Sequence, residues 1–526
     1  MAHPFAGRSL AVISDFDRDE RRYLFNKTRE LKEALNRDDT KRIEQFRINN
    51  PDFGIYEVFL EDSTRTKESF KHAALFHRAK LSALSTDSSS FNKGESYADT
   101  FNNLAGYDNR VFIIRSKLEG VCRWLEKATS SYTERNNLPW SASFINAGDG
   151  RHEHPTQELL DEFTFLEDNN WDYSSIHIAL VGDLYHGRTV HSKADGLQVF
   201  DSVKVDLIAP DVLEMPPYYV RQMRDNGYEV RMFPSIEQYL SQEDLAKKWY
   251  FTRPQLERMG DRVLKRQDEL REMISFHQRF LPLLPEGTIF YHPLPRNKDK
   301  PELPVFLDDL PLNGWERQSA NGRLVRIVLV GMLGGLLGDD FTAVNKVKQP
   351  DEARFIEYVD TSDRTGPKRY SEGVHPISEG IVIDHICKGD SSQEIREHMG
   401  KIVSTLALHG KGGEWVSTSQ EDESMLKGII FRPGHSTLKE KKIRQLAAIA
   451  PGCTLNVISQ GAVKKKYRLH TPPKLYGIKG LTCNNELCIS CPDHHEGVTP
   501  HFIRTEEGSM RCLYCDTTYS FKEIWR

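Results

Sequence analysis

Apolar runs that alternate with amphipathic stretches dominate the first 340 residues. The runs include IYEVFL, NRVFIIR, IHIALVGD, KVDLIAP, KKWYFT and TIFYHPL, and the stretches include FKHAALFHRAKL and PTQELLDEFTFLE. This alternation is typical of parallel strands joined by helices, because a parallel connection needs a long crossover. The sequence therefore predicts an α/β fold with two doubly wound parallel sheets. The run RLVRIVLVGMLGGLL, which ends near Gly338, predicts a long buried helix that completes this part.

The rest of the chain predicts further, smaller domains. At 526 residues the chain is too long for one core, since single cores stop growing near roughly 250–300 residues. Residues 346–370 are polar and contain two prolines, so we expect a linker there. A smaller α+β pattern begins around GIVIDHI and runs to about Pro473, where a cysteine-rich end follows.

Composition and charge exclude several classes of protein. Hydrophobic residues make up 38% and charged residues 28% of the chain, which is typical of globular proteins and not of disorder. The net charge of −5 gives the whole chain no electrostatic reason to bind polynucleotides or anionic membranes. No apolar run is long enough to cross a bilayer, and the N-terminus has acidic residues where a signal peptide needs apolar ones. We expect a cytoplasmic protein with no nucleic-acid or membrane partner.

The cysteines predict a metal site near the C-terminus. Five of the eight cysteines lie between residues 483 and 515, which favours a local metal site over a disulfide framework. A C-x4-C pair and a C-x2-C pair, separated by 23 residues, bring four thiolates to one zinc ion. We predict one structural zinc ion per chain in a small zinc-ribbon β domain, bound by Cys483, Cys488, Cys512 and Cys515. Cys491 is a spare thiol that could compete for the place of Cys488.

Three polar clusters in the first part carry candidate site residues, and the first follows a predicted strand. Ser63, Thr64, Arg65 and Thr66 fall at the first turn of a predicted helix, where free N–H groups and a guanidinium suit a phosphate. The alternative is that the hydroxyls only cap the helix and that Arg65 is solvated.

The second cluster places a histidine at the start of a helix. In NAGDGRHEHPTQ the helix begins at Pro155, a favoured first position, so His154 lies at its cap. A neutral imidazole there can donate a hydrogen bond to a carbonyl oxygen, although a lone histidine is more often a cap or a surface residue.

The third cluster, VGDLYHGRTVHS, is a strand, a turn and a helix with Arg188 in its first turn, and it lacks GxGxxG. Arg188 could clamp a carboxylate there. Further on, TRPQLER places Arg253 and Gln255 at one strand end, and YHPLPR places Leu294 and Pro295 at another. Strand ends of open α/β sheets are the usual ligand-binding edge.

Together these motifs resemble the transcarbamoylase family over nearly all of residues 1–340. STRT, SSSFNKGE, NAGDG…HPTQ, VGDLYHGRTVHS, TRPQLER and HPLPR occur in the family's order and spacing. The resemblance indicates aspartate as the acceptor, since ornithine enzymes carry a cysteine in the motif where this chain has His292-Pro293-Leu294-Pro295. It implies transfer of a carbamoyl group from carbamoyl phosphate to L-aspartate in pyrimidine biosynthesis, without a catalytic metal.

The resemblance also implies a role for each site residue. Carbamoyl phosphate would contact Ser63, Thr64, Arg65, Thr66 and Arg115, and its carbonyl oxygen would contact Thr66, Arg115 and His154. Its amino group would face Gln157, Leu294 and Pro295, whereas L-aspartate would contact Arg188, Arg253 and Gln255. Ser89 and Lys93 would reach a neighbouring subunit's site, so a homo-oligomer built from catalytic trimers is implied. The stretch after Arg296 departs from the family's usual sequence, which leaves its packing open.

The C-terminal third resembles the regulatory chain of aspartate carbamoyltransferase. GIVIDHI, MLKGIIF, APGCTLNVI and VKKKYR carry the resemblance, which covers about residues 371–526 and implies ATP or CTP as effectors. The implied effector contacts are Val374, Ile377, Asp384, His385, Lys427, Asn456, Ile458 and Lys466. Glu423 and Gly461 stand where the family has a lysine and a tyrosine, and residues 464–466 could instead be a solvated charged run.

The predicted domains are 1–165 for carbamoyl phosphate, 166–345 for aspartate, a linker at 346–370, a nucleotide-binding domain at 371–475 and a zinc-binding domain at 476–526. Three other functions are weighed against this one. They are a transcarbamoylase for another amino acid, a catalytically inert scaffold or nucleotide sensor, and a nucleic-acid-binding zinc ribbon, which would require a net basic surface.

Overall fold

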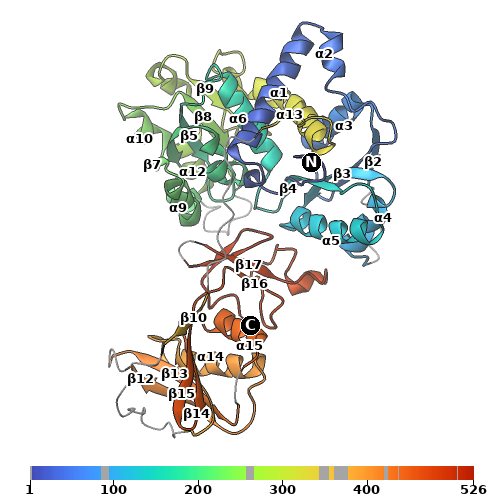
Figure 1. The fold of residues 1–526 in the computed structure, drawn as a ribbon. Helices are drawn as coiled ribbons and strands as arrows, with labels where there is room; N and C mark the ends of the chain where they lie inside the picture. The colour runs from blue at the N-terminus through green and yellow to red at the C-terminus, as the bar shows by residue number, and fades with distance from the viewer. Residues whose placement is uncertain are drawn as a thin grey trace. The chain divides into compact units, whose positions relative to one another are not determined.

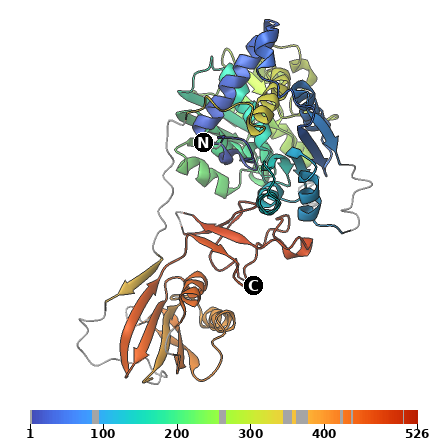
Figure 2. The same ribbon diagram turned by 45° about the vertical axis from the view of Figure 1, so that its right-hand side comes forward.

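The computed structural model describes residues 3–84, 94–255, 266–342, 355–360, 377–419, 424–435, 438–505 and 508–525. The chain divides into two compact units, which are residues 1–346 and residues 347–526. Figures 1 and 2 show the elements of each unit. No helix among the described residues is long and apolar enough to cross a membrane.

The first half of the first unit is built on a parallel sheet with the strand order β2-β1-β3-β4. Its strands are β1 (Gly54–Phe59), β2 (Lys80–Ala83), β3 (Asn109–Ser116) and β4 (Ser143–Asp149). The helices of this half are α1 (Arg18–Asn36), α2 (Thr40–Glu44), α3 (Thr64–His77), α4 (Tyr97–Ala105), α5 (Val121–Arg135) and α6 (Pro155–Glu167). β1 and β3 were predicted from their apolar runs, whereas β2 and β4 were not named from the sequence.

A second parallel sheet forms the other half, with the strand order β7-β6-β5-β8-β9. Its strands are β5 (Ser175–Gly182), β6 (Ser202–Ile208), β7 (Glu229–Phe233), β8 (Lys248–Thr252) and β9 (Ile289–Tyr291). Its helices are α7 (Arg188–His191), α8 (Lys193–Gly196), α9 (Pro217–Asp225), α10 (Ile236–Leu240) and α12 (Gln267–Ile274). Two parallel sheets in one unit confirm the α/β class predicted for this part of the chain.

The long helix α13 (Trp315–Leu333) is the last helix described in the first unit and is buried along most of its length. It was predicted from its apolar run, but it begins earlier and ends before Gly338. Although α13 follows the second sheet in sequence, it packs against α1, α3 and α6 of the first half. The polar side chains that α13 carries are thereby brought next to α6.

The second unit begins with a six-stranded antiparallel sheet with the order β10-β15-β14-β11-β13-β12. Its strands are β10 (Ile356–Val359), β11 (Gly380–Ile386), β12 (Gly413–Thr418), β13 (Leu426–Pro433), β14 (Thr454–Ser459) and β15 (Ala462–Leu469). The range 346–370, expected to be a linker, thus contains β10, which pairs with β15. No periodicity is evident there in the sequence, because β10 is only four residues long and lies at the sheet edge.

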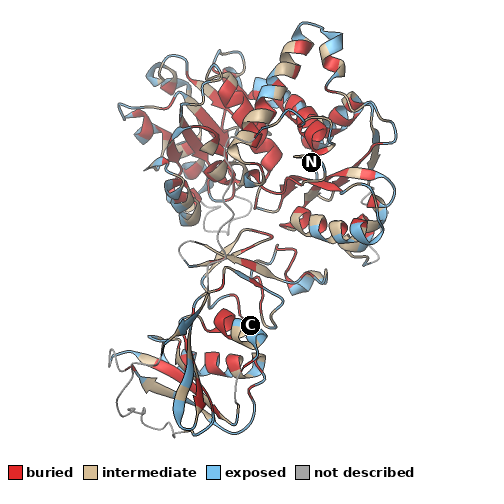
Figure 3. Ribbon diagram, viewed as in Figure 1, coloured by how far each residue is buried: buried red, intermediate tan, exposed pale blue. Residues whose placement is uncertain are grey.

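Helices α14 (Ser392–Thr405) and α15 (Glu440–Ile449) lie on one face of this sheet, as Figures 1 and 2 show. The last part of the unit is a small antiparallel sheet with the order β16-β17-β18-β19. Its strands are β16 (Lys474–Tyr476), β17 (His501–Arg504), β18 (Met510–Cys512) and β19 (Thr518–Tyr519). Figure 3 shows that buried residues concentrate in the two parallel sheets and in α6, whereas β15 of the second unit is largely exposed.

Candidate active site and metal centre

A cavity of about 540 Å³ lies in the first unit, at the carboxyl ends of strands from both parallel sheets. Its lining comes from the segments after β1, β4, β5, β8 and β9, from the end of β3, and from α3, α6 and α13. Carboxyl ends of parallel strands share one sheet edge, so side chains from distant segments meet there. Of the residues predicted for catalysis and substrate binding, the lining includes Ser63, Thr64, Arg65, Thr66, Arg115, His154, Gln157, Arg188, Arg253, Gln255, Leu294 and Pro295. Ser89 and Lys93 lie outside the described residues.

The N-terminus of α3 opens into this cavity. Ser63 occupies the position before the first helical residue, but its side chain makes no capping hydrogen bond. The hydroxyl of Ser63 is therefore not used for capping, which was the alternative to a ligand-binding role. Thr66 is buried, whereas Arg65 is exposed and lines the cavity. Free amides of the first turn and the guanidinium of Arg65 together form a site suited to an anion.

Two partly buried guanidinium groups, those of Arg115 and Arg188, lie side by side near this helix. Nη1 of Arg115 donates to the carbonyl oxygen of Ala147, and Nη1 of Arg188 donates to that of Gly150, each over 3.0 Å. Both groups also face one carboxylate, since Oε2 of Glu61 lies 3.6 Å from Arg115 and 3.7 Å from Arg188. Burial, reinforced by Arg188, lowers the pKa of Arg115 to about 10, so this group stays charged at neutral pH.

Gly148 makes the approach of these two groups possible. A Cβ atom at residue 148 would lie 2.6 Å from Nη1 of Arg115 and 3.1 Å from Cζ of Arg188. The φ angle of Gly148 is +112°, which side chains rarely adopt. The strand β4 can therefore end beneath both guanidinium groups only with glycine at this position.

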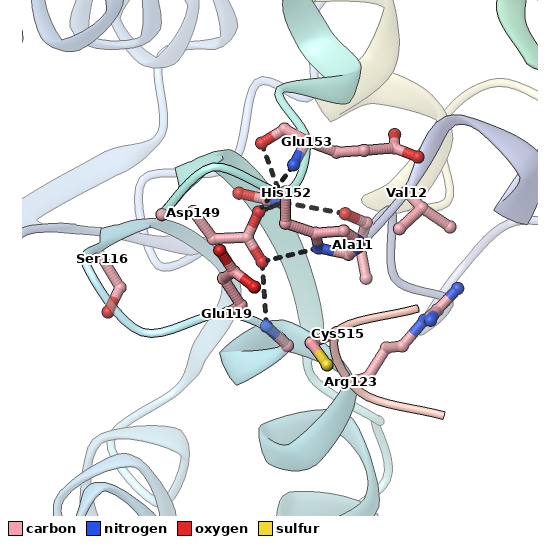
Figure 4. A network of polar contacts seen from close by, with 12 residues as sticks. Ala11, Val12, Ser116, Glu119, Arg123, Asp149, His152, Glu153 and Cys515 are labelled. Atoms are coloured by element: carbon pink, nitrogen blue, oxygen red, sulfur yellow. Dashed lines mark hydrogen bonds and ion pairs between the residues drawn. The ribbon is translucent and has the colours of Figure 1, made fainter. Parts of the chain in front are cut away.

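The turn after β4 is held by the carboxylate of Asp149 (Figure 4). Asp149 accepts hydrogen bonds from the backbone N–H of Gly120, from the side-chain amide of Asn146 and from the backbone N–H of Glu153. Nδ1 of His152 lies 3.1 Å from the same carboxylate. Burial alone would raise the pKa of Asp149, but His152 and these donors outweigh it and lower the pKa. The turn is thus fixed on the side that carries His154.

His154 lies directly before the first residue of α6 but does not cap this helix through its side chain. Only 6% of the residue is exposed, so it is neither a surface histidine nor a side-chain cap. Burial, followed by the positive charges of Arg188, Arg115 and Arg326, holds the pKa of His154 well below its usual range. The imidazole is therefore neutral at neutral pH and can donate a single ring N–H.

Arg253 and Gln255 follow β8 and face the same cavity. The backbone N–H of Gln255 donates to Oδ2 of Asp183 over 2.9 Å, and its side-chain amide lies 3.3 Å from the carbonyl oxygen of His186. Asp183 is fully buried and also accepts from the backbone N–H of His186. One buried carboxylate therefore ties the segment after β8 to the segment that carries Arg188.

The segment after β9 carries Leu294 and Pro295, and the chain beyond it is anchored by Arg296. This guanidinium makes a bidentate contact with Asp308, at 2.6 and 3.0 Å, and also donates to the carbonyl oxygen of Leu303. Oε2 of Glu302 lies 3.6 Å from Nε2 of the buried His292. The unusual stretch after Arg296 thus packs back onto the residues just before Leu294.

Sequence reasoning did not find two further lining residues, Arg326 and Gln318, which lie on α13. Arg326 is buried and donates to the hydroxyl of Ser69 over 2.9 Å, while burial lowers its pKa to about 10. The sequence signal that could have found both residues is their polar character within an otherwise apolar helix. With Arg326, the lining contains five arginines and, among the described residues, one acidic side chain, that of Asp62. Such a cavity suits ligands with several negative charges.

The second unit contains a compact group of four cysteines. The Sγ atoms of Cys483, Cys488, Cys512 and Cys515 all lie within 4.8 Å of one another, and all four residues are buried. Two Sγ distances, 3.7 and 3.8 Å, match the roughly 3.8 Å expected for thiolates at 2.3 Å from a tetrahedral zinc ion. Within the described residues, Cys491 is not part of this group.

Hydroxyl groups surround these sulfur atoms. The hydroxyls of Tyr519, Ser490 and Thr517 each lie 3.2 Å from one of the cysteine Sγ atoms. The hydroxyls of Tyr519 and Ser490 can donate to these sulfur atoms, and such donors stabilise thiolate ligands, as outer partners of metal sites usually do. The residues present therefore fit a structural metal ion.

Six of the residues predicted to contact an effector lie on strands β11, β13, β14 and β15 of the six-stranded sheet, and Ile377 lies just before β11. Asn456 on β14 is directly opposite Val382 on β11 and Lys466 on β15, so their side chains share a face. Nζ of Lys427 lies 2.9 Å from Oδ1 of Asp384, which neighbours the predicted contact His385 in sequence. Gly380 on β11 faces both Ile458 and the side chain of Ile377. Val374 and Glu423 lie outside the described residues.

Three family models match this chain in order. Residues 8–167 match "Aspartate/ornithine carbamoyltransferase, carbamoyl-P binding domain". Residues 372–470 match "Aspartate carbamoyltransferase regulatory chain, allosteric domain", and residues 473–525 match the metal binding domain of the same chain. The arginine-lined cavity between strand ends and the first of these matches define the class of the first unit as a carbamoyltransferase, and hence an enzyme.

Full-length relatives carry the same combination of parts. The chain is 59% identical to the protein PyrBI of Treponema denticola, with 100% of this chain and 99% of the relative covered. It is 50% identical to the PyrBI protein of Thermotoga maritima, with both chains fully covered. The chain belongs to the aspartate carbamoyltransferase family, and it joins the catalytic and the regulatory chain in one polypeptide.

A solved structure is similar to the catalytic part. It is aspartate transcarbamoylase from Trypanosoma cruzi in complex with carbamoyl phosphate and aspartate. The sequence identity is 28% and the TM-score is 0.52, over 62% of this chain and 96% of that one. Its likeness covers the arginine-lined unit and leaves out the regulatory part.

The lowered pKa of His154 can be tested directly. We expect its ring to remain neutral at pH 6.5, where a histidine in a peptide is about half protonated. Nitrogen chemical shifts of ring-labelled histidine, assigned with a His154→Gln variant, measure this. A ring that titrates like that of a free peptide would contradict the burial and the arginine contacts described above.

Proposed function

We propose that the cavity catalyses the reaction of carbamoyl phosphate with L-aspartate to give N-carbamoyl-L-aspartate and phosphate, a step of pyrimidine biosynthesis in the cytoplasm. The observation that carries this proposal is the set of five arginines around one cavity, since both substrates are multiply charged anions. In the Trypanosoma cruzi structure with both substrates, the related fold holds carbamoyl phosphate and aspartate.

The phosphate group is assigned to the N-terminus of α3. Ser63, Thr64 and Thr66 offer hydroxyl and amide donors there, and Arg65 offers a guanidinium that no described ion pair occupies. Arg115 supplies a second cation from the end of β3. A helix N-terminus with two guanidinium groups stabilises a dianion through its dipole and through charge-assisted hydrogen bonds.

The carbonyl oxygen of the carbamoyl group is assigned to Thr66, Arg115 and His154. This oxygen gains negative charge when the amine attacks, so donors aimed at it stabilise the transition state more than the ground state. A neutral His154 keeps one donating N–H without adding a further charge beside Arg188 and Arg115. Gln157 and the backbone at Leu294 and Pro295 are assigned to the amino group of the same substrate.

The two carboxylates of L-aspartate are assigned to Arg188, Arg253 and Gln255. Held there, the α-amine of aspartate points at the carbonyl carbon, where a C–N bond forms. The C–O bond to phosphate breaks, phosphate leaves with the electron pair, and the amine releases a proton. An amino acid with a cationic side chain would face these arginines, so aspartate is favoured over ornithine as the acceptor.

Substitution of Arg65 tests the phosphate site. We expect Arg65→Ala to lower kcat by about 10²–10³-fold with aspartate as acceptor, because a positioned donor to the developing charge is lost. Product formation from carbamoyl phosphate and aspartate, with ornithine as the comparison acceptor, measures this.

Arg78→Ala is the matched control at the other end of α3, where the exposed Arg78 contacts Glu44 and Asn49 and does not line the cavity. It should change kcat by less than about twofold. Near-normal activity of Arg65→Ala would contradict the assignment of the phosphate site. If the unaltered protein transferred the carbamoyl group to neither acceptor, an inert scaffold would be favoured.

We further infer that the metal of the second unit is one zinc ion, bound by Cys483, Cys488, Cys512 and Cys515. When bound, the ion would cross-link the segments around β16–β19, which are too small to fold on a hydrophobic core alone. Its chemistry is structural, since four thiolates fill a tetrahedral site and leave no open position.

Removal of one thiolate separates this structural role from catalysis. We expect Cys512→Ser to lose bound zinc and the fold of the small sheet, whereas transfer to aspartate by the first unit persists. Cys491→Ser, which changes a cysteine outside the group, should keep its zinc. Elemental analysis and kinetics on the same samples measure both properties. Loss of the intrinsic chemistry together with the zinc would contradict a purely structural metal.

We infer as well that the six-stranded sheet binds ATP or CTP. Lys427 and Lys466 would contact phosphates, Asp384 the ribose, and His385, Asn456, Ile377, Ile458 and Val374 the remaining nucleotide. We also propose that the catalytic parts of three chains form a trimer, in which Ser89 and Lys93 reach the active site of a neighbouring chain. Paired regulatory parts would join such trimers.

The nucleotide site can be tested on aspartate saturation. We expect ATP and CTP to shift the half-saturating aspartate concentration. Lys466→Met should lower the affinity for these nucleotides by about tenfold or more, because a charge-assisted hydrogen bond is lost. Lys465→Met changes the adjacent residue, whose side chain points to the opposite face, and should keep the response. No shift in the unaltered protein would reduce the regulatory part to an assembly module.

A further inference from the structure

A buried carboxylate beneath the cavity binds two side-chain amides at once. Oδ1 of Asp161 accepts from Nε2 of Gln157 over 2.9 Å and from Nε2 of Gln318 over 2.6 Å. Asp161 is on α6, one turn after Gln157, and is fully buried. Gln318 reaches it from α13, so the contact joins the two helices that flank the cavity.

The other oxygen of Asp161 is also occupied. Oδ2 accepts from Nζ of Lys193 over 2.9 Å, and the same ammonium lies 2.7 Å from Oε2 of Glu158. Lys193 is fully buried and lies 4.1 Å from the ring centre of Tyr250. Because an ammonium group only donates, it fixes Oδ2 as its acceptor and leaves Oδ1 for the two amides.

This arrangement decides which way each amide points. A carboxylate only accepts hydrogen bonds, so each glutamine must turn its NH₂ group toward Asp161 and its oxygen away. For Gln318 the result is visible, since its Oε1 accepts from the backbone N–H of His292 over 2.9 Å. For Gln157, which lines the cavity, Oε1 is the atom left for a ligand.

We propose that Asp161 is a positioning residue that makes the site select a carbamoyl group, by holding Gln157 so that its Oε1 accepts a hydrogen bond from the amino group of the substrate. This inference rests on the role proposed above for Gln157. Through Gln318 and His292, the same carboxylate also holds the segment that leads to Leu294 and Pro295, since Nδ1 of His292 accepts from the backbone N–H of Leu294.

The selectivity follows from what the amino group can do. Acetyl phosphate has the shape of carbamoyl phosphate but carries a methyl group in place of the NH₂ group. A site that presents a fixed, buried acceptor binds the donor and disfavours the methyl group, because the acceptor would stay unpaired. If Gln157 turned its NH₂ group to the cavity, that preference would be lost.

Asp161→Asn is the direct test, because it keeps the shape and changes the hydrogen-bonding pattern. Lys193 is a charged donor and should attract the oxygen of the introduced amide, which turns the NH₂ group of that amide toward Gln157. Gln157 must then reverse its own amide, and Gln318, whose Nε2 faces the same atom, loses its hydrogen bond to residue 161. In the full-length protein we expect kcat/KM for carbamoyl phosphate to fall by about tenfold. The inhibition constant of acetyl phosphate should change by less than about twofold, since a methyl group makes no hydrogen bond to lose.

Two further variants separate the possible results. Glu162→Gln is the matched control, because Glu162 is a buried, ion-paired carboxylate on the same helix that pairs with Arg21 and contacts neither amide in the described contacts. It should leave the preference for carbamoyl phosphate over acetyl phosphate unchanged. Gln157→Met should abolish the preference, and in Gln157→Met/Asp161→Asn the second change should add nothing further.

The results that overturn the proposal are distinct. If kcat/KM for carbamoyl phosphate and the affinity for acetyl phosphate fall in parallel in Asp161→Asn, or if neither changes, Asp161 does not set the selectivity. If Gln157→Met keeps the preference, the role of Gln157 in the proposed function fails as well, whereas loss of the preference in Gln157→Met alone would leave that role intact.

A second variant keeps the test informative if Asp161→Asn does not fold. Asp161→Leu removes the carboxylate but leaves the buried Lys193 paired with Glu158, 2.7 Å away, so no buried charge loses its only partner. Gln157 loses its fixed partner there too, so the preference for carbamoyl phosphate should disappear. A retained preference in this folded variant would also overturn the proposal.

Discussion

The burial of several guanidinium groups around one cavity is the constraint on which the catalytic unit depends. Arg115 and Arg188 lie close enough for burial and mutual repulsion to lower the pKa of Arg115 to about 10. The fold tolerates this because backbone carbonyl oxygens of Ala147 and Gly150 accept from them and because Glu61 faces both. An anionic ligand in the cavity would add negative charge beside these groups and would relieve the same repulsion.

Buried carboxylates next to the cavity hold the residues that line it in fixed orientations. Asp149 holds the turn before His154, Asp183 ties the segment of Gln255 to that of Arg188, and Asp161 fixes the amide of Gln157. Each of these side chains is buried and accepts from several donors, so each can adopt few other arrangements. The buried carboxylates therefore set the orientation of the side chains in this site, while the arginines supply its positive charge.

Motifs at strand ends were the part of the site that could be predicted from the sequence. Arg65, Arg188 and Arg253 each follow an apolar run, and parallel strands bring such positions to one edge. His154 was found from its place directly before Pro155, a favoured first helical residue. Arg326 and Gln318 could not be found in this way, because α13 looks like a uniformly apolar helix and its place beside α6 is a tertiary contact. The short strand β10 was missed since four edge residues carry no clear period.

The sequence by itself determined the class of fold, the order of the parts and the chemistry of the four cysteines, because apolar periodicity and ligand spacing are local properties of the chain. Only the tertiary structure decided which nitrogen or oxygen each side chain presents. The amide of Gln157 is turned by Asp161, which is held by Lys193 from a different half of the unit. Such orientation depends on hydrogen-bond partners that are distant in sequence, and no local pattern encodes them.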